Sequence, residues 1–201
     1  MGTTRHPRRA RLSVVARHGE SSANVGRTVS SDPARRVALT VRGRTQARQL
    51  GAQLANLGVD LAVSSCFLRT QLTLELGLRG RPVRVLIDQG FDEIRAGDFD
   101  GEPIEAYWSW DRSHTQSERF PRGESVDEAL LRYAHALRRL LSRTEPVTLV
   151  VVHEFALHHI TAAATTSPSL FPHPHFANAL PYLFDGSAIE RAAVGIAESA
   201  Q

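Results

Sequence analysis

The sequence contains no lysine. All 24 basic residues are arginines, in a chain of 201 residues. Three classes of site depend on a lysine amine: the phosphate loop of nucleotide hydrolases, the protein-kinase ATP site, and Schiff-base sites, including those for pyridoxal phosphate. The absence of lysine excludes them. Arginine alone suits bidentate recognition of phosphate or carboxylate groups.

Cysteine and long apolar runs are also scarce. Cys66 is the single cysteine, so there is no internal disulfide framework, and a reducing compartment suits the chain. The longest apolar run, residues 147–152, is far shorter than the roughly 20 residues of a membrane helix, and the N-terminus lacks the apolar core of a secretory signal. A net charge of +3 is too small to indicate nucleic-acid binding. We expect a cytoplasmic protein that binds neither membrane nor nucleic acid.

The order of predicted elements indicates an α/β fold. Strands are predicted at 12–16, near 60–65, at 83–87 and at 147–152, and helices at about 40–57, 67–77, 125–143 and from about 155. This alternation predicts a three-layer sandwich: a mainly parallel central sheet with helices on both faces. The C-terminal part is predicted to form two more strands around a turn at Asp185-Gly186.

One domain is expected over residues 12–201, after a flexible basic tail at 1–11. Residues 88–124 mix glycine, proline, tryptophan and charge without a sustained period, as in long excursions that carry function, and about 100–124 is its lid-like part. Its aromatic residues form either an apolar lid or a small core under a loop, and the sequence does not decide between the two. They are Tyr107, Trp108, Trp110 and Phe120.

Charged side chains follow four of the predicted strands. Arg17 and His18 come after the first, Arg69 after the second, Glu93 after the third and His153 after the fourth. The carboxyl ends of parallel strands meet at one edge of a sheet, where ligands bind. A phosphoryl group in transfer spreads negative charge over three oxygens, so its site needs fixed cationic donors and an activated nucleophile. The pattern therefore favours phosphoryl transfer.

These stretches, taken in order, resemble the histidine phosphatase superfamily, which has the phosphoglycerate mutase-like fold. The matching stretches are "RHGES…N" (17–24), "LTVRGRTQA" (39–47), "SSCFLRTQLT" (64–73), "DEIRAGDFDG" (92–101), "RGESVDEALLR" (122–132) and "VVHE" (151–154). The resemblance implies that His18 is the nucleophile and becomes phosphorylated. It also implies that Arg17, Arg69 and His153 hold the phosphate oxygens, and that Asn24 supplies a neutral donor.

The resemblance implies three further roles. Gly19 lets the backbone turn tightly and fix the imidazole tautomer through a carbonyl. Glu93 is the proton donor to the leaving oxygen, and its pKa should be raised by partial burial among anionic oxygens. Asp92 is a less favoured substitute. The serine residues after Gly19 and the stretch 40–43 are read as caps and turns.

Within the family, the acid motif favours a phosphatase. Cofactor-dependent mutases have "ERHYG" here and use a lysine on the phosphoglycerate carboxylate, whereas this chain has "DEIRAG" and no lysine. We expect a phosphoric monoester hydrolase of histidine acid phosphatase type, acting on a small phosphomonoester without metal or cofactor. A mutase and a catalytically inactive relative are the alternatives, and a homodimer is left open. Glu154 stands where many relatives of the family have glycine, and the sequence does not decide whether it narrows the pocket or repels acidic substrates.

Other catalytic patterns fail on spacing. "GESSA" lacks the last glycine of a serine nucleophile elbow and follows only one strand. In "HEFALHH", His158 lies about 140° round the helix from His153, where a zinc-binding pair needs about 40°. A cysteine phosphatase with Cys66 would need arginine in place of Leu72. "PHPH" (172–175) has no nearby cysteine or carboxylate and is read as a surface loop and not as a metal site.

Overall fold

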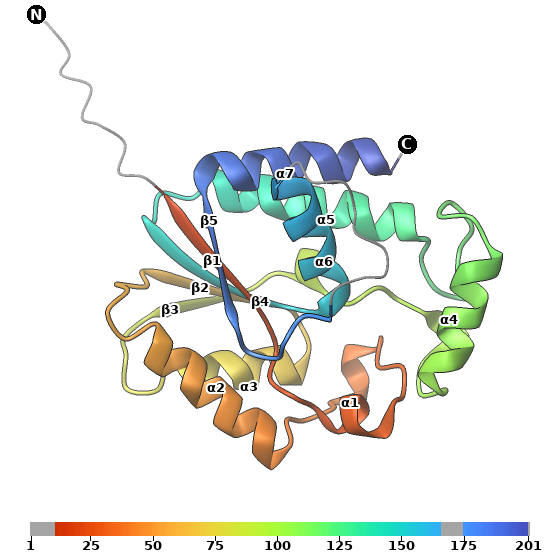
Figure 1. The fold of residues 1–201 in the computed structure, drawn as a ribbon, viewed down its shortest axis with the longest axis horizontal. Coiled ribbons are helices and arrows are strands. Elements are labelled where there is room, and N and C mark those ends of the chain that lie inside the picture. Colours follow the sequence, from red (N-terminus) through yellow and green to blue (C-terminus); the bar gives the residue numbers. More distant parts are fainter. Residues whose placement is uncertain (1–10, 166–174, 201) are drawn as a thin grey trace, which may run out of the picture.

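The computed structural model describes residues 11–165 and 175–200, in which one five-stranded sheet is flanked by helices (Figure 1). The strands are β1 (Leu12–Arg17), β2 (Leu61–Ser64), β3 (Arg84–Ile87), β4 (Val147–Val152) and β5 (Pro181–Asp185). The helices are α1 (Ser22–Gly26), α2 (Val41–Gln53), α3 (Leu68–Gly77), α4 (Ile104–Ser113), α5 (Val126–Leu141), α6 (Glu154–Thr165) and α7 (Gly186–Ser199). The strand order is β3-β2-β4-β1-β5; only β5 runs antiparallel to its neighbour.

Helices cover both faces of this sheet. Helices α2 and α3 lie on one face, and α5, α6 and α7 lie on the other (Figure 1). Successive residues of a strand point to opposite faces. Val15 and Val150 therefore join the core beneath α5 to α7, whereas Val14 and Leu149 join the core beneath α2 and α3. The predicted three-layer α/β sandwich with a mainly parallel sheet is confirmed.

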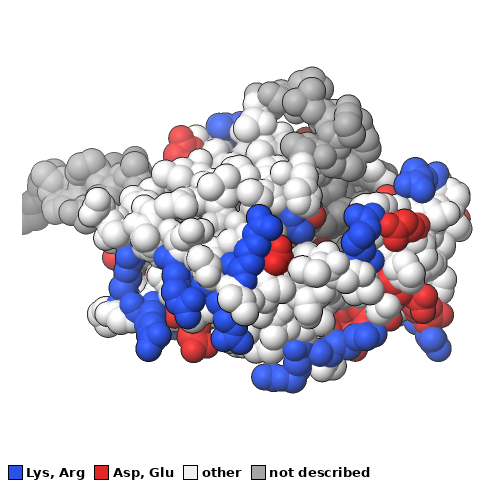
Figure 2. All heavy atoms as spheres, turned by 60° about the horizontal axis from the view of Figure 1, so that its bottom comes forward, with Lys and Arg blue, Asp and Glu red and all other residues white. Residues whose placement is uncertain are grey.

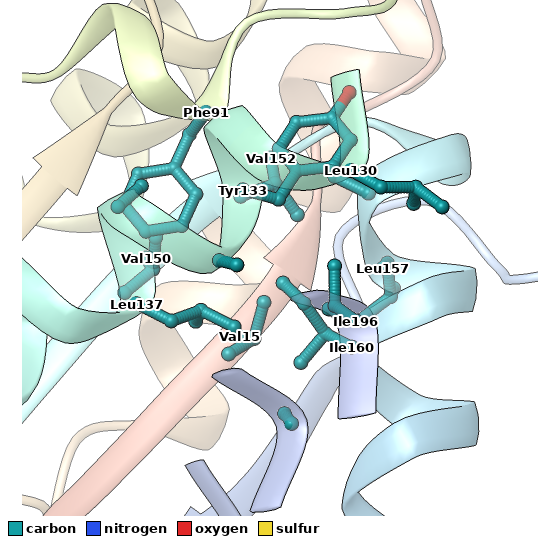
Figure 3. Packing of buried hydrophobic residues seen from close by; sticks show 14 of the residues in the cluster. Val15, Phe91, Leu130, Tyr133, Leu137, Val150, Val152, Leu157, Ile160 and Ile196 are labelled. Atoms are coloured by element: carbon teal, nitrogen blue, oxygen red, sulfur yellow. The ribbon is translucent and has the colours of Figure 1, made fainter. Parts of the chain in front are cut away.

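Helix α5 anchors the larger core. It begins at a capping box, in which Ser125 Oγ accepts from the Glu128 N–H and a Glu128 carboxylate oxygen accepts from the Ser125 N–H. Figure 3 shows side chains of this helix meeting strand residues of the sheet. Each fully buried aliphatic side chain stabilises the fold by about 1.5–3 kcal/mol. The labelled members of this cluster are Val15, Phe91, Leu130, Tyr133, Leu137, Val150, Val152, Leu157, Ile160 and Ile196.

The prediction of two C-terminal strands is wrong for the second one. Residues 181–185 form β5, but the chain then continues as α7. Asp185 caps this helix, because its Oδ1 accepts a hydrogen bond from the Ala188 N–H at 2.8 Å. Ile189, Ala193 and Ile196 recur every three or four residues and are buried. This helical period outweighs the strand-like appearance of the apolar residues.

The excursion contains α4, a helix that the sequence reading did not find. Tyr107 stacks on Phe120 with ring centroids 4.9 Å apart, and the Trp110 ring lies 4.1 Å from the Phe120 ring. Trp108 is instead 42% exposed, with the Arg27 guanidinium 5.6 Å from its ring centroid. Three of the four aromatic residues thus form a small core, and Trp108 lies at the surface.

Two predictions fall largely outside the described residues. Of the basic tail at 1–11 only Arg11 is described, and of "PHPH" only His175. Helix α2 begins after its cap Thr40, as expected, but ends at Gln53 and not near residue 57. In residues 11–165 and 175–200, no helix combines the length and apolarity needed to cross a membrane.

Candidate active site

Two arginines differ from all other described arginines by being buried. Figure 2 shows one face of the molecule, on which exposed arginine side chains gather mainly in the lower half of the view, with acidic side chains among them. Arg17 and Arg69, by contrast, are only 5% and 3% exposed. A buried guanidinium is costly unless hydrogen-bond acceptors or an anion surround it. These two residues therefore mark the place where a ligand's negative charge would be stabilised.

The parallel register of β1 and β4 brings the two candidate histidines together. Arg17 pairs with Val152, and the His18 N–H continues the ladder to the Val152 carbonyl at 2.9 Å. His18 and His153 are the next residues on each strand, and their ring centroids lie 5.3 Å apart. Both side chains are buried. The meeting of strand ends that the sequence predicted is thus present.

His18 is held as a neutral imidazole with a defined tautomer. Its Nδ1 lies 2.7 Å from the Gly19 carbonyl oxygen, which only accepts, so Nδ1 carries the proton and Nε2 holds the lone pair. Burial lowers the pKa of His18 well below its usual value, and the charges of Arg69 and Arg17 lower it further. Arg69 Nε donates to this Nε2 at 3.0 Å. The lone pair is thus available to an electrophile once Arg69 turns away.

Close backbone contact fixes the turn after His18. A Cβ atom on Gly19 would lie 2.5 Å from the Gly43 carbonyl oxygen, and one on Gly43 would lie 2.0 Å from the Glu20 carbonyl oxygen. The Gly19 N–H donates to Thr73 Oγ1 at 3.0 Å. Only glycine at both positions lets the start of α2 press against this turn. The stretch 40–43 thus acts as a cap and turn, as expected, and its backbone packs against the turn that follows His18.

His153 is also neutral, with the opposite tautomer. Arg69 Nη2 donates to its Nδ1 at 3.0 Å, so its Nε2 carries the proton and donates to Ser65 Oγ at 2.9 Å. Burial, followed by the charge of Arg69, lowers the pKa of His153 well below its usual value. Nδ1 therefore faces the centre of the site as an acceptor. Ser65 lies in the matching stretch 64–73, but the sequence predicted no role for it.

Arg69 links the two histidines. Besides its bonds to both imidazoles, it donates from Nη1 to Ser30 Oγ and from Nη2 to the Ser30 carbonyl oxygen, each at 2.9 Å. Burial lowers the pKa of Arg69 to about 10, so the group remains a cation at neutral pH. Ser30 was not singled out by the sequence reading, because nothing local marks a serine that meets a residue 39 positions away.

Arg17 has one nitrogen without a protein acceptor. Its Nη1 donates to the Phe176 carbonyl oxygen at 2.9 Å, and its Nη2 lies 3.0 Å from Glu154 Oε2. Within the part of the chain that the structure describes, its buried Nε has no hydrogen-bond partner. A buried cationic N–H without an acceptor is unfavourable, and an anionic oxygen of a ligand would satisfy it. Arg17 is thus suited to hold a phosphate oxygen.

Glu93 lies beside this cationic centre. Its Oε2 is 3.8 Å from His153 Nδ1, and its side chain is 21% exposed. Burial raises the pKa of Glu93, although Arg69 and Arg17 oppose that effect. A carboxyl group with a raised pKa next to an anion-binding centre has the properties of a proton donor. Asp92 is occupied elsewhere: its Oδ1 accepts from the Cys66 N–H at 2.7 Å.

Helix α5 holds the backbone of the acid motif. Tyr133 Oη and Arg132 Nη1 each donate to the Asp92 carbonyl oxygen at 2.9 Å. Arg132 is itself bound by Glu124, a carboxylate that is 1% exposed. The stretch 122–132 was part of the sequence resemblance, but no role had been assigned to these side chains. They position the segment that carries Glu93.

Asn24 is placed differently from the other predicted site residues. Its Oδ1 accepts from the N–H and the hydroxyl of Ser21, both at 2.9 Å, and forms the capping box of α1. No described contact joins Asn24 to the histidines or to the buried arginines. Asn178, which was not predicted, does reach the centre: its Nδ2 donates to the His18 carbonyl oxygen at 2.8 Å.

In the described ranges, 11–165 and 175–200, no group of three or more histidine, cysteine or acidic residues is arranged to hold a metal ion. The polar centre instead consists of two guanidinium groups, two neutral imidazoles and two carboxyl groups, those of Glu93 and Glu154. Such a set can bind an anionic phosphoryl group, attack it through His18 Nε2 and supply a proton from Glu93.

Comparison with known proteins identifies the family. The model of the histidine phosphatase superfamily (branch 1) matches residues 13–188, so the chain belongs to this superfamily. A probable phosphoglycerate mutase GpmB from Erwinia tasmaniensis is 31% identical over 153 residues, which cover 71% of this chain and 69% of that protein.

Two solved structures share the fold. Bacillus stearothermophilus YhfR superposes with a TM-score of 0.74 at 25% identity, over 87% of this chain and 90% of that one. A putative alpha-ribazole-5'-P phosphatase from Escherichia coli gives a TM-score of 0.71 at 26% identity, over 88% and 90%. The relatives thus include proteins named as a mutase and as a phosphatase.

Proposed function

We propose that this protein is a cytoplasmic phosphomonoester hydrolase that acts on small phosphorylated metabolites through a phosphohistidine at His18. The observation that carries the proposal is the neutral, buried His18, whose Nε2 lies beside the Arg69 guanidinium, with the unpartnered Arg17 Nε in the same centre. A neutral imidazole is a nucleophile, and the two fixed cations are suited to the charge that develops on the phosphoryl oxygens.

In the first step, the substrate phosphate draws the Arg69 guanidinium away from His18 Nε2, and another phosphate oxygen accepts from Arg17 Nε. A protonated phosphate oxygen donates to His153 Nδ1, which is already an acceptor. The Nε2 lone pair attacks phosphorus, and the bond between phosphorus and the ester oxygen breaks. Glu93 donates its proton to that departing oxygen, which leaves as an alcohol.

In the second step, water takes the place of the alcohol. The Glu93 carboxylate accepts a proton from this water as its oxygen attacks phosphorus. The bond between phosphorus and Nε2 breaks, and its electron pair returns to Nε2, so His18 is neutral again. Inorganic phosphate leaves, and Glu93 is protonated for the next turnover.

A mutase is the second candidate, because a relative 31% identical is named a probable phosphoglycerate mutase. The hydrolase is favoured by the acid motif "DEIRAG" and by the absence of lysine. A relative named a putative alpha-ribazole-5'-P phosphatase also supports hydrolysis. The two differ in the fate of the phosphoryl group: a hydrolase gives it to water, and a mutase returns it to a phosphoglycerate.

The test is to mix the protein with a phosphomonoester, quench it in alkali and locate the phosphate. We expect an acid-labile phosphate on His18 and stoichiometric release of inorganic phosphate, both unaffected by EDTA. Interconversion of 2- and 3-phosphoglycerate without phosphate release would indicate the mutase. Phosphate on Ser21 or Cys66, or activity that EDTA abolishes and Mg²⁺ restores, would contradict the mechanism.

A further inference from the structure

Glu154 lies at the catalytic centre but has no part in the two chemical steps. It is the residue after His153 and the first residue of α6. Its Oε2 lies 3.0 Å from Arg17 Nη2, and its Oε1 lies 2.7 Å from His175 Nδ1. The side chain is 36% exposed, so the carboxylate reaches the solvent side of the site.

The carboxylate and the substrate phosphate would share one guanidinium. Arg17 offers Nη2 to Glu154, and its Nε has no acceptor among the described residues. A phosphate on Nε therefore sits on the nitrogen next to the one that Glu154 holds. Two anions bound to neighbouring nitrogens of one guanidinium lie closer together than the Debye length of about 8 Å at physiological ionic strength. Salt therefore screens the repulsion between Glu154 and the phosphate only weakly.

The influence of Glu154 also extends to the proton donor. Its negative charge adds to the rise in the pKa of Glu93, for which burial is the larger cause. The carboxylate therefore acts electrostatically on both Arg17 and Glu93. Arg17 offsets the charge of one substrate anion, but it already faces Glu154, and Arg69 is the other buried arginine of the described chain. Among the described residues, no further buried arginine is left for a second negative group on the substrate.

We infer, on the basis of the proposed function, that Glu154 is a specificity-determining residue that excludes substrates with a second acidic group next to the phosphate. The substrate class then consists of phosphomonoesters of neutral or positively charged alcohols. Esters such as phosphoglycerates, which carry a carboxylate close to the phosphate, would be poor substrates.

The experiment compares two esters that differ in one group. Glycerol 3-phosphate has a hydroxymethyl group where 3-phosphoglycerate has a carboxylate. We would measure kcat/KM for both esters in the wild type, Glu154→Gln and Glu145→Gln. The control Glu145 pairs with Arg143 at 2.8 Å and precedes β4, at the end of the strand opposite His153. The Glu145→Gln substitution thus removes one negative charge, as Glu154→Gln does, but far from the site.

Glu154→Gln should raise the ratio of kcat/KM for phosphoglycerate over glycerol phosphate by about tenfold, as expected for removing one nearby charge. Glu145→Gln should leave this ratio at the wild-type value. Equal changes for both esters in Glu154→Gln would show that Glu154 only orients Arg17, and would overturn the inference. An equal rise in Glu145→Gln would overturn it as well.

A binding measurement separates this inference from the proposed function. In a His18→Ala background, calorimetry gives the dissociation constants of the two esters with and without Glu154→Gln. The same tenfold relative gain for phosphoglycerate is expected there. If the wild type hydrolyses neither ester but this binding ratio changes, the proposed hydrolase fails and the charge selection stands. If hydrolysis occurs and the binding ratio is unchanged, the charge selection fails.

Discussion

The cationic centre and the excursion that contains α4 are built in different ways. Arg17, His18, Arg69 and His153 are buried and come from strand ends or from the first turn of a helix that follows a strand. The excursion instead packs Phe120 and its neighbouring aromatic rings against the edge of the larger core, is tied by backbone hydrogen bonds to residues 27–29, and presents Trp108 to solvent. The sheet thus fixes the reacting groups within narrow limits, whereas the excursion has room to vary. We expect chemistry to depend on the first region and substrate size to depend on the second.

The largest effect should come from replacing the nucleophile. His18→Ala removes the group that forms the covalent intermediate in the proposed mechanism, so kcat should fall by roughly 10⁴-fold or more. Phosphate release and phosphate trapping should be lost together, at an unchanged melting temperature. Residual activity close to that of the wild type would mean that the centre is not the site of catalysis and would remove the basis of the comparison.

The next largest effect concerns the acid. Glu93→Gln should lower kcat/KM by roughly 10²–10⁴-fold on an alkyl phosphate, because a poor leaving oxygen needs a proton. An activated aryl phosphate should lose much less in its first step, and slow dephosphorylation of His18 would then appear as a burst. Equal losses on both substrates would place the acid elsewhere, and Asp92 would be the next residue to replace.

A smaller effect is expected from the support behind the acid. Tyr133→Phe removes the hydroxyl that donates to the Asp92 carbonyl oxygen but leaves the Arg132 bond to the same atom. We expect kcat on alkyl phosphates to fall by about 3- to 10-fold, the size of one positioning hydrogen bond, with KM unchanged. Aryl phosphates should again be affected less. A loss confined to KM, or equal for both substrates, would show that Tyr133 does not act through Glu93.

The acid should also destabilise the folded protein at neutral pH. Burial raises the pKa of Glu93 above its usual value of 4.5, so folding favours the protonated form. Stability is then lost as the pH rises from 4.5 through the folded pKa. Glu93→Gln cannot ionise and should melt at a higher temperature than the wild type at neutral pH, with the difference vanishing in acid. A difference that is constant with pH would contradict the raised pKa.

The smallest effect on turnover is expected in the excursion. Trp108→Ala removes a cation–π contact with Arg27, worth about 0.5–1 kcal/mol at an exposed site, and should leave kcat/KM on a small ester unchanged. Trp110→Ala is the matched variant inside the aromatic cluster and should cost about 2–4 kcal/mol in unfolding free energy, since it leaves a cavity beside Phe120. A large loss of turnover with Trp108→Ala would show that the excursion takes part in catalysis.

The sequence predicted the centre better than its surroundings, for a physical reason. Short buried strands are strongly patterned, and a parallel register necessarily places the residues after Arg17 and Val152 next to each other. The supports of the centre depend on contacts between distant backbone and side-chain groups. Ser30 and Asn178 carry no local pattern that distinguishes them from surface residues. The helical period of α5 places Tyr133 in the core but does not show that its hydroxyl reaches the Asp92 carbonyl oxygen.

The same reason explains the missed helices. Helix α7 carries enough isoleucine and valine to resemble a strand. Its helical spacing of buried residues distinguishes it from a strand only together with the N-cap at Asp185. Helix α4 is short and rich in aromatic residues, and glycine and proline lie near it in the sequence. Its apolar residues therefore do not show a helical period that the sequence alone reveals. The role of Asn24 rested on the family resemblance alone, and the contacts seen here are those of a helix cap.

Between turnovers of the proposed hydrolase, the hydrogen bond from Arg69 Nε occupies the lone pair of His18 Nε2. In the proposed mechanism this hydrogen bond makes His18 a latent nucleophile, whose electron pair is occupied until an anion competes for the Arg69 guanidinium. A neutral electrophile that diffuses into the site does not compete for the Arg69 guanidinium, so the hydrogen bond to His18 Nε2 remains in place. Under the proposed mechanism the resting protein should resist inactivation by uncharged alkylating reagents, and the phosphate group of the substrate would itself trigger the reactivity of His18.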